Sequence, residues 1–484
     1  MQDRGTPLVV YNSLTRRSEE FRPMVDDQVR IYSCGPTVYN YPHIGNLRAY
    51  VLSDTLQRAL RWKGYEIRKV VNITDVGHLV ADADSGDDKL EEAARASTES
   101  VYDLARRYEA AFHADLEMLR ILPADLYPRA TDYIPQMVEF AAVLERKGAA
   151  YRLPTGLYFD TSTSPGYGRL AGLRADDQRE GARVDVVAGK RNKTDFAVWR
   201  TEQPGERRLM RWESPWGWGA PGWHLECSVM SIDLLGSHFD IHTGGVDHRE
   251  LHHVNEIAQS EAYLDDGADW VPYWLHNEFI NVKSAKMAKS KGTGLRLVEL
   301  VEDGVDPAAY RLWLLTSHYR AQSDFSRAAI DAAGTTLRRL RARVDGPLPI
   351  DRTQTYQAAM AAAGDEARAV VRRIDEAVSD DLNTARVLAV LQEALQNDDL
   401  PVDDRRLVAA VAENLLGLGL DEPAVEAAAL PADLEATVLD MLAQRVKARE
   451  ARDWGLADQI RSNLERMGIG IKDTPQGTTW EPIK

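Results

Sequence analysis

Residues 29–46 read VRIYSCGPTVYNYPHIGN, and the predicted architecture extends outward from them. The apolar run Val29–Ser33 predicts a short buried strand, and Cys34–Thr37 supplies turn residues after it. A helix is predicted next, because apolar residues recur at helical spacing, namely Leu47, Val51, Leu56 and Leu60. Gly64 stands where a helix C-cap would, and a second apolar strand follows around Lys69–Ile73. This order predicts a β-α-β unit that opens a doubly wound parallel sheet.

The start of that helix is a candidate anion site. His43 and Asn46 stand in its predicted first turn, where unpaired N–H groups and the helix dipole favour a polyphosphate. Capping of the helix alone is the alternative interpretation. A second cluster, Lys286, Lys289 and Lys291 before Gly292, could clamp a phosphoryl group, although a solvated charge run is its alternative. The two tracts together indicate a phosphate-binding site more specifically than either tract does alone.

Length and charge limit the classes of protein that are possible. The 484 residues predict about three domains at roughly 150 residues each. Lys and Arg total 59 against 75 Asp and Glu, so the net charge of −16 argues against a general electrostatic nucleic-acid binder, while local basic stripes remain possible. No apolar run approaches the ~20 residues that cross a bilayer, and residues 1–15 lack the apolar core of a secretory signal. We therefore expect a cytoplasmic protein with no membrane partner.

The two cysteines, Cys34 and Cys227, are too few for a disulfide framework and suggest buried thiols or metal ligands. His252 and Glu256 lie four residues apart and therefore share one face of a predicted helix. Two cysteines, one histidine and one carboxylate form a plausible zinc set. Their spacing is not that of a zinc finger, so buried structural thiols remain the alternative, and His224 and His253 are rival ligands.

Short motifs follow one another in a fixed order along nearly the whole sequence. They are CGPTVY at 34–39, HIGN at 43–46, NITD at 72–75, GWHLECS at 222–228, GGVD at 244–247, HHVNEIAQS at 252–260 and KMAKS at 286–290. The series extends to DDLNT at 380–384, DWGLAD at 453–458 and DTP at 473–475. In this order the motifs resemble those of the cysteinyl-tRNA synthetases, which are class I aminoacyl-tRNA synthetases.

The resemblance implies an ATP-dependent ligase. The enzyme would activate L-cysteine to cysteinyl-adenylate and transfer it to the 3′ end of tRNA(Cys), with Mg²⁺ accompanying ATP. One zinc ion per chain is implied, held by Cys34, Cys227, His252 and Glu256. Zinc that binds the substrate thiol would reward sulfur over the oxygen of serine, a distinction that a hydrophobic pocket makes only weakly.

The resemblance also implies roles for individual residues. The catalytic residues match the HIGH and KMSKS signatures and are His43, Asn46, Lys286 and Lys289. The expected ATP-binding residues are His43, Asn46, Asp247 and Lys289, and the expected substrate-binding residues are Thr74 and Trp223. Asn46 replaces the second histidine of HIGH, Ala288 replaces the serine of KMSKS, and Asp247–Leu251 replaces a usually apolar stretch. The four-residue spacing from His252 to Glu256 favours His252 over His253 as the ligand.

Together these patterns predict an α/β fold. We expect a Rossmann-like nucleotide-binding catalytic domain with an inserted connective subdomain, then an α-helical bundle and a small C-terminal anticodon-binding module. The expected segments are the catalytic halves at 1–122 and 213–280, the insertion at 123–212, a KMSKS-loop stem-contact region at 281–330, the tRNA-binding bundle at 331–430 and the C-terminal module at 431–484.

The region after Asp331 is expected to bind tRNA. Three arginines recur at positions i, i+4 and i+7 of a predicted helix, namely Arg445, Arg449 and Arg452, and Trp454 offers a ring for base stacking. A second cluster lies on an earlier helix: Arg338, Arg339, Arg341 and Arg343. The alternative is that these arginines pair with nearby acids on ordinary surface helices.

Two other functions compete with the main hypothesis. The cysteine ligase of mycothiol synthesis shares the catalytic half and would use an aminosugar as acceptor, but it would not need the long region after Asp331. A non-catalytic RNA-binding paralogue would not need His43, Lys286 and Lys289 together. The family expectation for the oligomeric state is a monomer.

Overall fold

The structure is a computed structural model. It describes residues 3–76, 94, 99–172, 188–206, 208–282, 294–344, 346–423, 432–451, 453–466, 469–474 and 477–482. The chain divides into two compact units, Met1–Glu422 and Pro423–Lys484.

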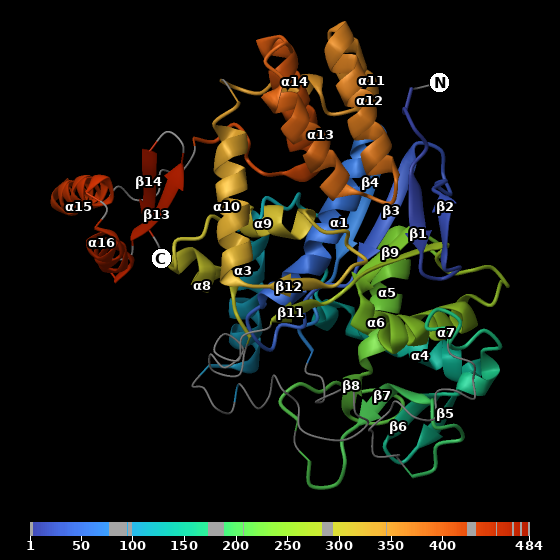
Figure 1. Ribbon diagram of the computed structural model, residues 1–484. Helices are drawn as coiled ribbons and strands as arrows, with labels where there is room; N and C mark the ends of the chain where they lie inside the picture. The colour runs from blue at the N-terminus through green and yellow to red at the C-terminus, as the bar shows by residue number, and fades with distance from the viewer. Residues whose placement is uncertain are drawn as a thin grey trace. The chain divides into compact units, whose positions relative to one another are not determined.

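A parallel four-stranded sheet forms the centre of the first unit (Figure 1). Its order is β10-β9-β3-β4, and its strands are β3 (Gln28–Ser33), β4 (Glu66–Val71), β9 (Ile241–Gly245) and β10 (Tyr273–Asn277). Helix α1 (Ile44–Trp62) joins β3 to β4, which confirms the predicted β-α-β unit. Because β4 and β9 flank β3 on opposite sides, the strand order reverses beside β3, and a crevice for ligands is expected at the carboxyl ends of these strands.

Side chains of β3 alternate between two hydrophobic cores, as a strand buried on both faces requires. Val29 and Ile31 belong to the core that contains α1, whereas Tyr32 belongs to the core that contains residues of α5 (Trp223–Leu235) and α7 (His252–Leu264). Helix α1 itself packs against the sheet and against the bundle helix α14 (Val402–Leu416). The candidate active-site helix is therefore held from both sides.

An antiparallel sheet of order β5-β6-β7-β8 interrupts the parallel sheet between β4 and β9. Its strands are β5 (Ala150–Leu153), β6 (Gly156–Phe159), β7 (Phe196–Thr201) and β8 (Gly219–Pro221). The helices before it are α3 (Val101–Met118), η2 (Ala130–Tyr133) and α4 (Ile134–Arg146), and η3 (Thr161–Thr163) follows β6. Near the N-terminus, β1 (Val9–Asn12) and β2 (Arg17–Glu20) form an antiparallel hairpin.

The predicted helix that carries His252 and Glu256 is confirmed as α7, but a short helix that was not predicted precedes it. Helix α6 (Val246–Glu250) ends before Leu251, and α7 begins at His252. Neither Gly nor Pro marks this break in the sequence, so periodicity alone did not reveal it. The break makes His252 the first residue of a new helix, beside the sheet edge.

The remaining elements of the first unit follow the parallel sheet. A short parallel pair, β11 (Ile280–Val282) and β12 (Ser323–Phe325), encloses α8 (Leu297–Glu302) and α9 (Pro307–Leu315) in sequence. The helical region then contains α10 (Arg327–Arg341), η5 (Ile350–Arg352), α11 (Tyr356–Ala362), α12 (Asp365–Ser379), α13 (Thr384–Gln396) and α14.

The second unit is small and has its own core. It contains α15 (Ala432–Glu450), α16 (Trp454–Arg466) and the antiparallel hairpin β13 (Ile469–Thr474) and β14 (Gly477–Pro482). Its buried core residues are Val438, Leu442, Ile460, Leu464 and Ile469.

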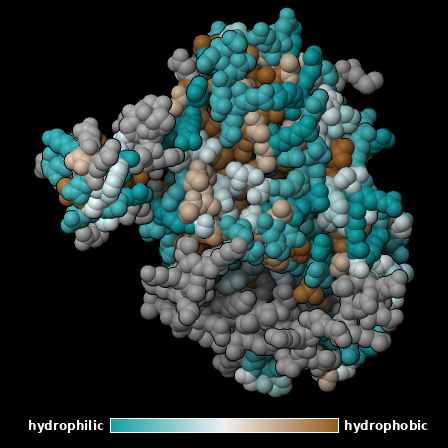
Figure 2. Space-filling model, in the orientation of Figure 1, coloured by the Kyte–Doolittle hydropathy of each residue, from teal (hydrophilic) through white to brown (hydrophobic). Residues whose placement is uncertain are grey.

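None of the described helices combines the length and the apolarity that crossing a membrane requires. Figure 2 shows mostly hydrophilic residues on the coloured part of one face, with hydrophobic residues in small separate patches.

Candidate active site and metal centre

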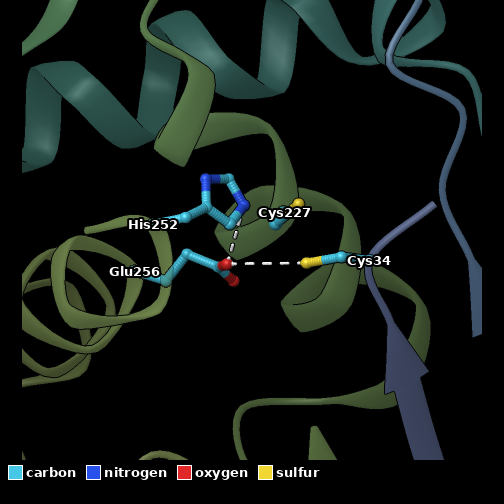
Figure 3. A group of neighbouring side chains, drawn as sticks. All are labelled: Cys34, Cys227, His252 and Glu256. Carbon is cyan, nitrogen blue, oxygen red and sulfur yellow. Dashed lines mark hydrogen bonds and ion pairs between the residues drawn. The ribbon is translucent and has the colours of Figure 1, made fainter. Parts of the chain in front are cut away.

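Four predicted ligands meet at the carboxyl edge of the parallel sheet (Figure 3). Cys34 follows the last residue of β3, Cys227 lies on α5, and His252 and Glu256 lie one turn apart on α7. One donor atom from each residue lies within 4.8 Å of all the others, and all four residues are buried. Glu256 Oε1 is 2.9 Å from His252 Nε2 and 4.0 Å from Cys34 Sγ. This group could hold a metal ion.

The electrostatics of the cluster suit a cation. Burial opposes the ionisation of Glu256, but His242 and His252 outweigh it and lower the pKa of Glu256 to about 2. Burial, together with Cys227 and Glu256, raises the pKa of Cys34 well above its usual range. The protein thus collects two thiols and an ionised carboxylate away from water, and a bound divalent cation would neutralise the carboxylate and favour the thiolate forms of the cysteines.

A second potential metal group overlaps the first and shares Cys34 and Glu256 with it. Its other members are His242, on β9, and His253. Cys34 Sγ is 3.2 Å from His253 Nε2, and His242 Nε2 is 3.0 Å from Glu256 Oε2. Sequence reasoning missed His242, because its position within a strand carries no spacing signal that relates it to α7.

The rival histidines occupy distinct places. His252 shares a donor group with both cysteines, whereas His253 belongs to the group with His242. His224 is in neither group, and its Nδ1 lies 3.0 Å from Nδ1 of His252. This contact leaves Nε2 of His252 facing Glu256, so His224 orients the ring as an outer partner of a metal ligand does.

His43 and Asn46 form a capping box at the start of α1. The backbone N–H of Asn46 donates to His43 Nδ1 at 3.2 Å, and the backbone N–H of His43 donates to Asn46 Oδ1 at 3.2 Å. Burial lowers the pKa of His43, so its ring stays neutral near pH 7. The capping interpretation is therefore observed, and it leaves the role of His43 in catalysis a prediction.

The two predicted catalytic lysines, Lys286 and Lys289, lie outside the described residues, as does Arg452. The chain after the lysines is described from Gly294 onward. The backbone N–H of Ile44 donates to the carbonyl of Leu295 at 2.8 Å, so the returning chain is attached to the start of α1.

The remaining predicted ligand-binding residues surround the same edge of the sheet. Thr74 is buried, and its hydroxyl donates to Glu226 Oε2 at 3.0 Å. Trp223 begins α5, and its ring centroid lies 4.1 Å from that of His252. Asp247 lies in the first turn of α6 and is exposed.

The predicted RNA-binding arginines differ in exposure. Arg445 is only 5% exposed and contacts the hydroxyl of Thr478 within the second unit, whereas Arg449 is exposed and Trp454 is 59% exposed. Arg341 was expected to belong to a surface cluster, and this was wrong. Its guanidinium is buried and donates to the carbonyls of Leu418 and Gly419, because the chain after α14 covers that face of α10. It also pairs with Asp306 at 2.7 Å and with Glu422 at 3.2 Å, as the alternative of acidic partners predicted.

Two family models match the chain. Residues 20–335 match a model described as tRNA synthetases class I (C) catalytic domain. Residues 432–480 match a model described as Cysteinyl-tRNA ligase anticodon binding domain.

Individual proteins are similar over almost the full length. A cysteine–tRNA ligase of Zymomonas mobilis is 44% identical, with 99% of this chain and 98% of the relative aligned. A cysteine–tRNA ligase of Novosphingobium aromaticivorans is 45% identical, with 99% of this chain and 97% of the relative aligned. Among solved structures, methionyl-tRNA synthetase of Mycobacterium tuberculosis bound by methionyl-adenylate is similar at a TM-score of 0.53 and 15% identity, over 86% of this chain and 94% of that one. That likeness shows a shared fold.

Proposed function

This chain belongs to the cysteinyl-tRNA synthetase family, and on that premise we propose that its sheet-edge site joins L-cysteine to tRNA(Cys) at the expense of ATP. The first step forms cysteinyl-adenylate and pyrophosphate, and the second moves the cysteinyl group to the 3′ end of the tRNA. The match of residues 432–480 to an anticodon-binding domain favours this function over the aminosugar ligase and over a paralogue without catalysis.

One observation carries the substrate assignment. Cys34, Cys227, His252 and Glu256 converge beside Trp223, at the same sheet edge toward which α1 presents its start. Soft sulfur donors with imidazole and carboxylate suit zinc, so we propose one Zn²⁺ per chain at this group. When bound, zinc would favour the thiolate form of a substrate thiol and would select sulfur over a serine hydroxyl.

The residues of this chain would divide the remaining work. Thr74 and Trp223 would bind and orient cysteine, and Asp247 would contact the nucleotide. His43 and Asn46 would meet the phosphates at the start of α1, where the unpaired N–H groups of a helix favour anions. Lys286 and Lys289 would stabilise the charge that develops on the triphosphate, which Mg²⁺ accompanies.

The helical region and the second unit would bind the tRNA. Arg449 and Trp454 are exposed and remain candidates for RNA contact, as does Arg452, whereas the burial of Arg445 favours a role in packing. We further propose that the protein acts as a monomer in the cytoplasm.

Cysteine-dependent exchange of pyrophosphate into ATP tests the first step, and charging of tRNA with labelled cysteine tests both steps. We expect both activities with cysteine and neither with serine at the same concentration. Exchange without charging would support activation but reject tRNA as the acceptor, and absence of both would reject the proposed function.

A further inference from the structure

Arg48 is a buried cation on the second turn of α1 that pairs with backbone rather than with an acid. Its side chain is almost fully buried, and its guanidinium donates to four main-chain carbonyls. Within the described part of the chain it forms no ion pair. A charge buried without partners is costly. The planar guanidinium offsets this cost here, because its several N–H donors can bond to several carbonyls at once.

The four carbonyls belong to two segments far apart in sequence. Arg48 Nη1 donates to Phe279 at 2.7 Å, directly before β11. Arg48 Nη2 donates to Ala321 at 2.6 Å and to His318 and Tyr319 at 3.3 Å each, in the turn before β12. Arg48 therefore fastens the beginning of the β11–β12 pair to α1.

The chain that returns after β11 is attached to the same helix. Besides the bond from Ile44 to Leu295, Gly294 lies against His43 so closely that a Cβ at Gly294 would be 3.0 Å from the Cβ of His43. Gly294 also has a φ of +76°, which favours glycine. Both ends of the stretch that contains the predicted catalytic lysines are thus attached to the first two turns of α1.

The turn of residues 318–321, which accepts hydrogen bonds from Arg48, is also bonded to the helical region. Asp381 accepts hydrogen bonds from the Tyr319 hydroxyl at 2.6 Å and from Arg320 Nε at 2.7 Å. Asp381 and Leu382 both have left-handed φ values, 52° and 57°, which are unfavourable for residues with a Cβ. Consecutive residues in this region persist where the surroundings fix them, so Asp381 is a well-defined partner for the turn of residues 318–321.

We propose that Arg48 is a positioning residue for cysteine activation, and this inference rests on the proposed function. It holds Phe279 and the turn of residues 318–321 at a fixed place relative to the helix start formed by His43 and Asn46. Lysine offers three donors from a single nitrogen and cannot span four carbonyls in two segments, whereas the planar guanidinium can. Misplacement of reacting groups by about 1 Å can slow catalysis by about 100-fold.

The test compares Arg48→Lys with Arg341→Lys, measuring cysteine-dependent pyrophosphate exchange by the full-length protein. Arg341 serves as the control, because it is also buried and also donates to backbone carbonyls, those of Leu418 and Gly419, although unlike Arg48 it also pairs with Asp306 and Glu422. For Arg48→Lys we expect kcat to fall by about 10- to 100-fold, with KM for cysteine within about twofold and bound metal unchanged. For Arg341→Lys we expect kcat within about twofold of the wild type.

Chemical rescue supplies a second test. Arg48→Ala should regain part of its kcat when millimolar guanidinium ions are added, whereas Arg341→Ala and the wild type should not gain. Should Arg48→Ala fail to fold, Arg48→Lys carries the test by itself. Equal kcat values for Arg48→Lys and Arg341→Lys would overturn the role of Arg48, as would a kcat loss that parallels metal loss. A wild-type protein without exchange would instead overturn the proposed function.

Discussion

Gly35 shows how a single residue places a potential metal ligand, Cys34. A Cβ at this position would lie 1.5 Å from the carbonyl oxygen of Asn72, so only glycine allows this close approach. The backbone N–H of Gly35 donates to Asn72 Oδ1 at 2.8 Å, Asn72 Nδ2 donates to Thr74, and Thr74 donates to Glu226. A chain of hydrogen bonds therefore links Gly35, which follows Cys34, to Glu226, which precedes Cys227.

Replacement of Cys227 with alanine tests the metal assignment. We expect Cys227→Ala to bind much less zinc and to lose most of its preference for cysteine over serine, because a soft ligand is removed. Metal analysis and exchange assays with both amino acids measure the two effects. The nearby Ser231→Ala is the control, since its hydroxyl donates to the carbonyl of Cys227 without being a potential ligand. Unchanged zinc and unchanged preference in Cys227→Ala would contradict the assignment.

Lys289 provides a prediction that concerns rate rather than metal. If it stabilises charge on the triphosphate in the transition state, Lys289→Ala should lose ~2.7–4 kcal/mol of that stabilisation and slow exchange by about 10² to 10³. The KM for ATP should change less than kcat, since the contact is made mainly in the transition state. An unchanged exchange rate would contradict this role and would favour the alternative that Lys289 belongs to a solvated run of charges.

Helices α1, α9 and α14 meet at a buried ionic cluster around Asp54. Arg58 Nε lies 2.8 Å from Asp54, Arg311 also pairs with it, and the two arginines donate to carbonyls at the ends of α3 and α14. Burial opposes ionisation of Asp54, but Arg311 and Arg58 lower its pKa to about 2. The cluster thus joins α1, which carries the candidate catalytic residues, to the helical region.

Acid should weaken this cluster in a defined range of pH. The pKa of Asp54 is lower in the folded protein than the ~3.9 of an unfolded chain, so its contribution of about 2 kcal/mol is present above pH ~4 and is lost as the pH falls towards 2. We expect Asp54→Asn to have a lower thermal unfolding midpoint at pH 7 and a shallower decline on acidification than the wild type. Midpoints measured across this range check the prediction, and parallel pH profiles would contradict it.

The elements also show what sequence patterns can and cannot predict. Short apolar runs with turn residues and a helical repeat predicted the β-α-β unit, because both signals are local. The burial of Arg445 depends on tertiary packing, although it continues the stripe of Val438 and Leu442 along α15. His242 joins its potential metal group only through the pairing of β9 with β3, which no local pattern encodes. The residues alone made a zinc set containing both cysteines plausible beside the alternative of buried structural thiols, and the family resemblance then favoured the zinc set.

At the scale of the whole molecule, the two units predict separable activities. A chain truncated after Glu422 should retain cysteine-dependent pyrophosphate exchange, because the potential metal ligands and α1 lie in the first unit. It should lose most tRNA charging, since residues 432–480 match an anticodon-binding domain. Binding of tRNA by the full chain should weaken steeply with added salt, as phosphate contacts require. A truncated protein that charges tRNA as well as the intact one would assign the second unit another role.

The central position of β3 has a consequence for biosynthesis. Cys34 lies 222 residues before Glu256, and at ~5–20 residues per second the ribosome needs about 10 to 45 s to make that stretch. Until β9 emerges, one edge of β3 lacks its neighbour, and the thiol of Cys34 has none of its potential metal-binding companions. The nascent chain therefore carries an open strand edge and an exposed thiol for tens of seconds, and a metal ion that needs all four potential ligands could bind only after this interval.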